Sequence, residues 1–216
     1  MDKKIELKET IGVTESIKIR KESVYLIISN KEKCQNLLNK KELKEGDIIE
    51  VLISLHIILE VGLNILFRTL TLMSIKKDIE ELEIIKNIDG ISFIDKTILF
   101  IYNSKFNFDN KLGEATSYHR IIGTLRDFSG SRNQILHGHA IVSICSDNIS
   151  RDSLLKKNIN LEFLGKQIEK FQLILKGMRF YLDCLDSSLT GTSKEIYKKS
   201  YLDDEFINNS YFKKKK

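Results

Sequence analysis

The sequence predicts an all-α protein built as an antiparallel helical bundle, and three observations lead to this fold class. Proline, the strongest helix breaker, is absent from all 216 residues. The segment Glu45–Ser74 is long, apolar and amphipathic. Between residues 161 and 189, apolar side chains alternate at spacings of three and four, which is the pattern of a helix packed in a bundle or a coiled coil.

The length and composition favour one main domain. Hydrophobic residues make up 42% and charged residues 30% of the chain, as in ordinary globular proteins. We divide the chain into an N-terminal appendage of residues 1–44, a helical bundle of residues 45–190 and a polar, lysine-rich tail of residues 191–216. Little packing is expected in the tail because few of its residues are apolar.

The first thirty residues have the weakest helical pattern. Ile17–Arg20 alternates apolar and basic residues, and Val24–Ile28 is a short apolar run rich in β-branched residues. A small two-stranded β-hairpin is expected here, with a short helix as the alternative. Residues 31–41 are expected to form a short helix or a helical connection.

The segment Ile48–Phe67 is apolar enough to be mistaken for a membrane span. At 100° per residue, however, seven polar side chains in and next to this segment fall in an arc of about 140°. This polar stripe consists of Asp47, Glu50, Ser54, Glu60, Asn64, Arg68 and Thr71. A lipid-spanning helix would not keep such a stripe, with two carboxylates inside it. We therefore predict a long soluble helix and no membrane association, with the stripe either solvated or functional.

The remaining elements are shorter, apart from the last helix. Helices are predicted over residues 78–87, 91–102 and 114–128, with a loop over residues 103–113 and a connection over residues 140–153. Asn160 has the side chain of a helix N-cap and precedes the last long helix. The apolar seam of that helix packs either inside its own subunit or against a second copy.

Charge and cysteine content narrow the class of protein. Four of the five positive charges in the formal net charge of +5 come from Lys213–Lys216, so composition shows no broad electrostatic footprint for nucleic acid. The cysteines, Cys34, Cys145 and Cys184, are widely spaced and form no C-x-x-C pair. Free thiols in a reducing cytoplasm are expected.

The stretch Ser131–His139 concentrates groups that bind phosphate and transfer protons. Arg132 carries a permanent positive charge on a planar guanidinium group, which can donate hydrogen bonds to two phosphate oxygens at once. His137 has an ordinary pKa of about 6.5, so it can exchange a proton near neutrality. Asn133 lies four residues before His137 and shares its helical face. These groups suit metal-free cleavage of a phosphodiester, although an Arg and a His on one helix also occur often by chance.

Helical phase separates the two central groups. If the helix from residue 114 continues unbroken, Arg132 lies on the same seam as Leu125 and Phe128, and His137 lies about 140° away from it. Ser129–Ser131 could instead interrupt or bend the helix. Two copies that face each other across a dimer axis would bring four groups, an Arg132 and a His137 from each copy, to one phosphate.

The pattern Arg132-Asn133-x-x-x-His137-Gly138 resembles the R-x(4–6)-H motif of HEPN domains, which are small helical bundles. The resemblance covers about residues 45–189 and implies a metal-independent endoribonuclease of toxin–antitoxin, abortive-infection or antiviral defence systems. It implies that Arg132 and His137 are the catalytic pair, that Asn133 assists them, and that no cofactor is used. The site would form in a homodimer, and the products would be a 2′,3′-cyclic phosphate or 3′-phosphate and a 5′-hydroxyl.

His139 complicates the resemblance. It also satisfies the motif, with six intervening residues, but His137 is preferred because Gly138 follows it, as in many members of the family. In addition, His139 stands where HEPN toxins silenced by adenylylation often carry the tyrosine of H-x-Y. That mode of silencing is therefore not expected.

Whether further residues belong to the predicted site depends on how the helices face each other. Glu60, Asn64 and Arg68 join the site if the polar stripe faces the motif. His56 is expected to be a boundary histidine, and His119 an exposed one.

The expected partners are RNA, a second copy, and an antitoxin or other defence protein. Two alternatives remain: a non-catalytic HEPN-like module that binds RNA, nucleotide or protein, and a structural helical dimerisation protein.

Overall fold

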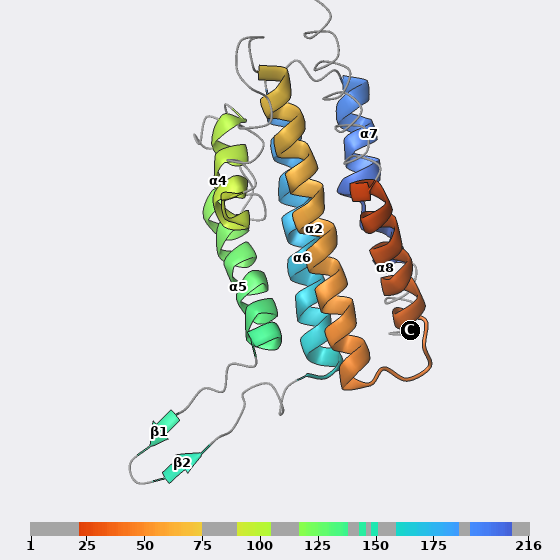
Figure 1. The fold of residues 1–216 in the computed structure, drawn as a ribbon, viewed down its shortest axis with the longest axis vertical. Helices are drawn as coiled ribbons and strands as arrows, with labels where there is room; N and C mark the ends of the chain where they lie inside the picture. The colour runs from red at the N-terminus through yellow and green to blue at the C-terminus, as the bar shows by residue number, and fades with distance from the viewer. Residues whose placement is uncertain are drawn as a thin grey trace, which may run out of the picture.

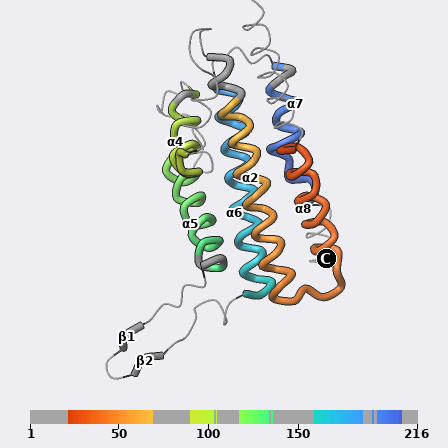
Figure 2. Tube along the Cα trace, in the orientation of Figure 1, coloured from red at the N-terminus to blue at the C-terminus, as the bar shows by residue number. Residues whose placement is uncertain are grey.

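The computed structural model describes residues 22–74, 90–104, 117–137, 143–145, 148–150, 159–185 and 191–208. Within this part the chain is a bundle of helices, so the all-α prediction is confirmed at that level (Figure 1). The helix of residues 22–38 and the later helix α7 lie on one side of the central α2, and α4 with α5 lie on the other (Figure 2). The long helix α6 packs against α2, α4, α5 and α7.

Helix α2, Glu45–Ser74, has the predicted bounds. Its segment Glu45–Arg68 is long and apolar enough to cross a membrane, with a mean hydropathy of 2.0, but 61% of the apolar window is buried inside the bundle. Val51, Leu55 and Leu59 are completely buried. The hydrophobicity of α2 is therefore accounted for by its position as the core helix of the fold.

Helices α4, Phe93–Asn103, and α5, Tyr118–His137, form the side of the bundle that carries the central motif. Ser92 caps α4, because its Oγ accepts a hydrogen bond from the backbone N–H of Asp95 at 3.2 Å. The structure resolves the question raised by Ser129–Ser131, since α5 continues through these residues without interruption. The helix predicted over residues 78–87 lies outside the described residues.

Helix α6, Leu161–Cys184, begins as predicted. The Oδ1 of Asn160 accepts a hydrogen bond from the backbone N–H of Phe163 at 2.9 Å, which confirms the N-cap. The apolar seam is buried inside the same chain at Leu164, Ile168, Phe171, Leu175, Met178, Leu182 and Leu185. It is therefore a core seam of the subunit rather than a seam reserved for a second copy.

The hairpin predicted near the N-terminus is wrong for Val24–Ile28, because residues 22–38 form a helix. Ile27, Cys34 and Leu38 recur at helical spacing and are almost completely buried. Burial of that face outweighs the β-propensity of the local sequence. The partner segment Ile17–Arg20 lies outside the described residues.

A short antiparallel pair of strands occurs elsewhere, in the stretch that we predicted to be a connection. Strand β1, Ser143–Cys145, pairs with β2, Asn148–Ser150, and Ile144 lies opposite Ile149. The pair joins α5 to α6 in chain order. The fold class remains all-α, because this hairpin is the one sheet among the described residues.

The expectation that the tail packs little is wrong up to residue 208. Helices α7, Gly191–Tyr201, and α8, Glu205–Asn208, contribute Tyr197, Leu202, Phe206 and Ile207 to the main core. These apolar residues are few, but they are spaced so that one face of the tail is covered by the bundle. The boundaries predicted after residues 44 and 190 therefore do not separate independent packing units.

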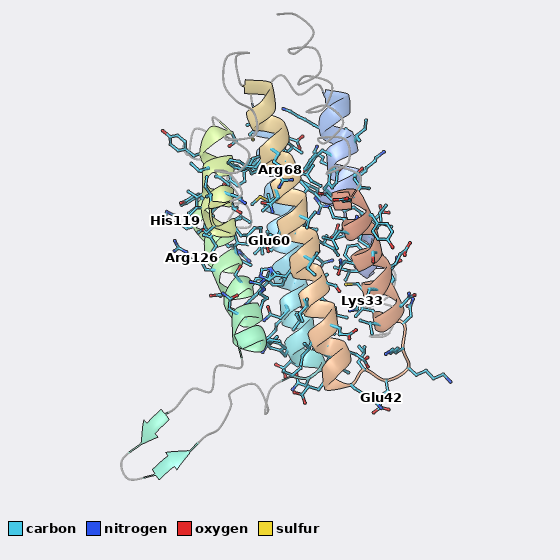
Figure 3. The ribbon with its side chains drawn as sticks, viewed as in Figure 1. Lys33, Glu42, Glu60, Arg68, His119 and Arg126 are labelled. Atoms are coloured by element: carbon cyan, nitrogen blue, oxygen red, sulfur yellow. The ribbon has the colours of Figure 1, made fainter. Side chains whose placement is uncertain are left out.

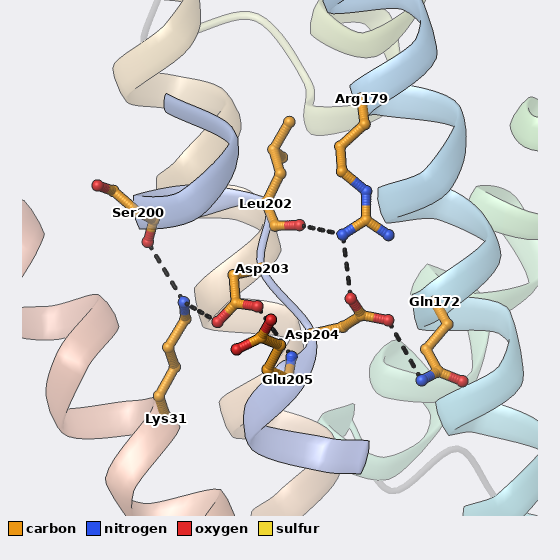
Figure 4. Close-up of polar contacts among 8 residues, drawn as sticks. All are labelled: Lys31, Gln172, Arg179, Ser200, Leu202, Asp203, Asp204 and Glu205. Carbon is orange, nitrogen blue, oxygen red and sulfur yellow. Dashed lines mark hydrogen bonds and ion pairs between the residues drawn. The ribbon is translucent and has the colours of Figure 1, made fainter. Parts of the chain in front are cut away.

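Polar contacts fasten the tail to the bundle at the turn between α7 and α8 (Figure 4). The Nη1 of Arg179 on α6 donates to the carbonyl oxygen of Leu202 at 2.9 Å and to Oδ1 of Asp204 at 3.0 Å. Lys31, on the first helix, donates to the carbonyl oxygen of Ser200 at 3.3 Å and pairs with Asp203 at 3.5 Å. The N-terminal helix, α6 and the tail are thus linked to one another.

Candidate functional site

A cavity of about 260 Å³ lies where α2, α4 and α5 meet. It contains three of the residues that the sequence singled out, Glu60, Arg132 and Asn133. Its full lining is His56, Glu60, Ser92, Phe93, Ile94, Ser129, Arg132 and Asn133. The polar stripe of α2 therefore faces the central motif at this level, and the interpretation of the stripe as wholly solvated is wrong here.

Arg132 lies on the inward side of α5. Leu125 and Phe128, on the same seam, are buried, and Arg132 itself is half-buried. Its Nη1 donates a hydrogen bond to Oδ1 of Asn133 at 3.0 Å. No carboxylate among the described residues pairs with its guanidinium. Arg132 can therefore offer several N–H donors and a positive charge to an anion in the cavity.

His56 is a buried residue of this cavity and not the boundary residue that we predicted. Its side chain is 4% exposed and packs edge-on against Phe128 and Phe93, with ring centroids 5.0 and 5.9 Å away. Burial, and then the positive charge of Arg132, lower the pKa of His56 from 6.5 to about 4. The imidazole is therefore neutral at pH 7.

Glu60 lies one turn beyond His56 on α2 and is half-buried (Figure 3). The i, i+4 spacing places both side chains on neighbouring positions of one helix face. This spacing was visible in the sequence, and it could have identified His56 as a site residue. Without knowing which helix covers α2, however, the imidazole could equally have been packed among apolar side chains, as the expectation of a boundary histidine assumed.

The other two site candidates on the stripe, Asn64 and Arg68, are not part of the cavity lining. Asn64 accepts a hydrogen bond at Oδ1 from the buried Nζ of Lys96 on α4, at 2.8 Å. Arg68 lies two turns beyond Glu60 on α2 and is half-buried (Figure 3). Asn64 therefore fastens α2 to α4, and the structure does not place Arg68 with the motif.

His137 is the last residue of α5, and the structure describes its backbone but not its side chain. Because α5 is continuous, positions 132 and 137 lie about 140° apart around its axis. Gly138 and His139 lie outside the described residues, so the choice between the two histidines stays a prediction. His119 is exposed on the outer side of α5, as predicted, and so is Arg126 (Figure 3).

The described residues also bear on two other kinds of site, a metal centre and a reactive thiol. No group of three or more His, Cys, Asp and Glu side chains there is arranged to hold a metal ion. Cys34 is fully buried, and this burial raises the pKa of its thiol to about 12, so the nucleophilic thiolate does not form near neutral pH.

The cavity between α2, α4 and α5 therefore combines a guanidinium, a carboxylate, a neutral imidazole and an amide. Together these groups can bind an anion, accept a hydrogen bond from a hydroxyl and take part in proton transfer. No protein-family model, curated protein or solved structure matches the chain.

Proposed function

We propose that the chain is a metal-independent endoribonuclease of the HEPN type that acts as a homodimer. The observation that carries the proposal is the state of Arg132, a half-buried guanidinium with no carboxylate partner among the described residues. It shares a cavity with Asn133, Glu60 and His56. A permanent cation held in this way is suited to the charge that develops on a phosphate during cleavage.

The proposed reaction is an intramolecular transesterification that cleaves a phosphodiester bond of RNA. The 2′-oxygen of a ribose attacks the adjacent phosphorus, the bond from phosphorus to the 5′-oxygen breaks, and a proton passes from the 2′-hydroxyl to the departing 5′-oxygen through protein groups. Arg132 binds the non-bridging oxygens, and His137 carries the proton. The products are a 2′,3′-cyclic phosphate and a 5′-hydroxyl, so no water is consumed.

A second copy supplies the histidine in this proposal. The support is the unbroken course of α5, because positions 132 and 137 of a continuous helix lie about 140° apart around its axis. A two-fold dimer brings the same surface of both copies together, so each Arg132 can meet the His137 of the other copy. By its resemblance to HEPN proteins, the enzyme is a toxin or antiviral defence effector that an antitoxin or other partner controls.

The decisive experiment measures cleavage of a labelled RNA in the presence of EDTA. We expect Arg132→Ala and His137→Ala each to lower the rate by at least about 100-fold, the effect of losing a charge-stabilising or proton-transferring group. Arg126→Ala and His119→Ala are matched controls, because both residues are exposed on the same helix, and they should retain wild-type rates. Undiminished cleavage in both Arg132→Ala and His137→Ala would remove the assignment.

Mixing the two inactive variants tests the shared site. After subunit exchange, a heterodimer of Arg132→Ala and His137→Ala contains one intact combination of arginine and histidine. With random exchange we expect about a quarter of the wild-type activity to return. If the mixed variants are as inactive as each variant alone, Arg132 and His137 act within one protomer. Arg132-dependent RNA binding by a wild type that does not cleave would instead identify the non-catalytic HEPN-like module.

A further inference from the structure

Two residues that line the cavity each carry a buried polar atom with no hydrogen-bond partner among the described residues. The two atoms are Nδ1 of His56 and Oγ of Ser129, on α2 and α5. Buried polar groups are almost always hydrogen-bonded, and leaving one unpaired costs about 1–3 kcal/mol. Two such atoms lie in side chains beside Arg132, which has no carboxylate partner in the described part of the chain, and together they point to a polar ligand.

The charges around the cavity define the chemistry of that ligand. Arg132, from α5, is the one cation in the lining, and Glu60, from α2, is the one carboxylate. The residues that α4 and its cap contribute, Ser92, Phe93 and Ile94, carry no charge. A ligand that satisfies both charged groups presents anionic oxygens to the guanidinium and an O–H or N–H donor to the carboxylate.

A ribose phosphate has both features. Its phosphate oxygens accept hydrogen bonds from a guanidinium, a hydroxyl and an imidazole N–H, and its vicinal hydroxyl donates to a carboxylate. The cavity volume of about 260 Å³ lies just below the range of about 300–1,000 Å³ that is usual for small-molecule sites. It suits one sugar phosphate better than a dinucleotide or a large cofactor.

We propose that this cavity is a ribose 3′-phosphate subsite contained within one protomer, in which His56 and Ser129 bind the phosphate together with Arg132, and Glu60 binds the vicinal 2′-hydroxyl. The identification of RNA as the source of this group rests on the proposed function. The subsite itself depends only on residues of α2 and α5. Helix α4 closes it, with Phe93 and Phe128 holding the imidazole ring in place.

Calorimetric titration of the full chain tests this assignment. The probes are adenosine 3′-monophosphate, its 2′-deoxy analogue, adenosine 5′-monophosphate and a tetranucleotide RNA that ends in a 3′-phosphate. We expect the 3′-monophosphate to bind more tightly than the deoxy analogue and the 5′-monophosphate, because only it places a hydroxyl beside the phosphate. The tetranucleotide should bind more tightly than the mononucleotide if RNA is the source, and equally if the source is a free nucleotide.

Substitutions then identify the binding groups. His56→Phe and Ser129→Ala should each weaken binding of the 3′-monophosphate about 10-fold or more, the effect of losing a hydrogen bond to a charged group. Glu60→Ala should remove the preference over the deoxy analogue. Ser131→Ala is a matched control on α5, because the Oγ of Ser131 already donates to the carbonyl oxygen of Asp127 at 3.0 Å, and it should bind as the wild type does.

The outcomes separate this inference from the proposed function. One outcome is RNA cleavage that depends on Arg132 and yet is unchanged in His56→Phe and Ser129→Ala. If these two variants also bind the 3′-monophosphate as the wild type does, the proposed subsite is wrong and the proposed nuclease activity stands. Binding that depends on these residues, without any cleavage of RNA, would retain the subsite and remove the nuclease. Ser129→Ala should fold normally, since its Oγ has no partner to lose among the described residues, so the test does not depend on His56→Phe alone.

Discussion

Acid should destabilise this protein through His56. In the folded chain, burial and the charge of Arg132 lower the pKa of this imidazole to about 4, whereas in the unfolded chain it returns to about 6.5. Between these values the unfolded state holds more protons than the folded state. The free energy of unfolding therefore falls as the pH falls from 6.5 to 4, and the stabilisation is fully present above pH 6.5.

The magnitude follows from the two pKa values. A difference of one in pKa corresponds to about 1.4 kcal/mol, so the complete loss amounts to about 3 kcal/mol. At pH 5 about 2 kcal/mol of this is already lost. For a chain of this size, a change of 2 kcal/mol lowers the melting temperature by about 4–8 °C. Such a loss is a substantial part of a typical stability of about 5–15 kcal/mol.

Urea unfolding in phosphate-free buffer, at several pH values between 7.5 and 5, measures this effect. The comparison is between the wild type and His56→Phe, because phenylalanine keeps an aromatic ring against Phe93 and Phe128 but cannot be protonated. Groups such as Asp47, whose pKa a hydrogen bond from Lys40 lowers, titrate in both proteins and cancel in the difference. His119→Phe, at an exposed position, should follow the wild type. Parallel curves for the wild type and His56→Phe down to pH 5 would refute the reasoning.

Three substitutions test the packing of the bundle by chemical denaturation. Gly177→Ala should lower the free energy of unfolding by about 1–3 kcal/mol, because an added Cβ on α6 would lie 2.8 Å from Cγ1 of Ile121 on α5. Gly123→Ala should instead raise it by about 0.4–1 kcal/mol, since this helical glycine is exposed and an added Cβ would meet no atom of the described residues within 4 Å; equal effects of the two substitutions would contradict the close approach of α5 and α6. Tyr197→Phe should cost about 1 kcal/mol, because the buried hydroxyl donates to the carbonyl oxygen of Gly62, and an unchanged stability would show that this bond does not fasten α7 to α2.

Local sequence patterns predicted the long helices well. The bounds of α2 agree with the amphipathic segment, and Asn160 caps α6 as expected. In contrast, residues 22–38 and 191–208 were assigned to an appendage and a tail, although both contribute to the core. Their local signals were β-branched in one case and polar in the other. A few apolar residues suffice when a preformed bundle covers the face that carries them.

The candidate site was predicted in part. Arg132 and Asn133 drew attention because the stretch Ser131–His139 concentrates groups that bind phosphate and transfer protons, and both residues line the cavity. His56 was misjudged, because its i, i+4 spacing to Glu60 does not distinguish a site histidine from one that is packed among apolar side chains. Its neighbourhood depends on which helix covers that turn, and α5 lies far from α2 in the sequence.

The sequence by itself determined the helical class, the extent of α2 and the N-cap of α6, because helix formation depends on residues within a few turns. It placed Arg132 on the seam of Leu125 and Phe128 only for an unbroken helix, and the structure decided that α5 is unbroken. Only the tertiary structure decided that His56 and Glu60 lie in one cavity with Arg132. It also decided that the seam of α6 is buried within a single chain. Burial, and with it the pKa of His56, depends on which surface covers a side chain, and that surface comes from helices that are distant in the sequence.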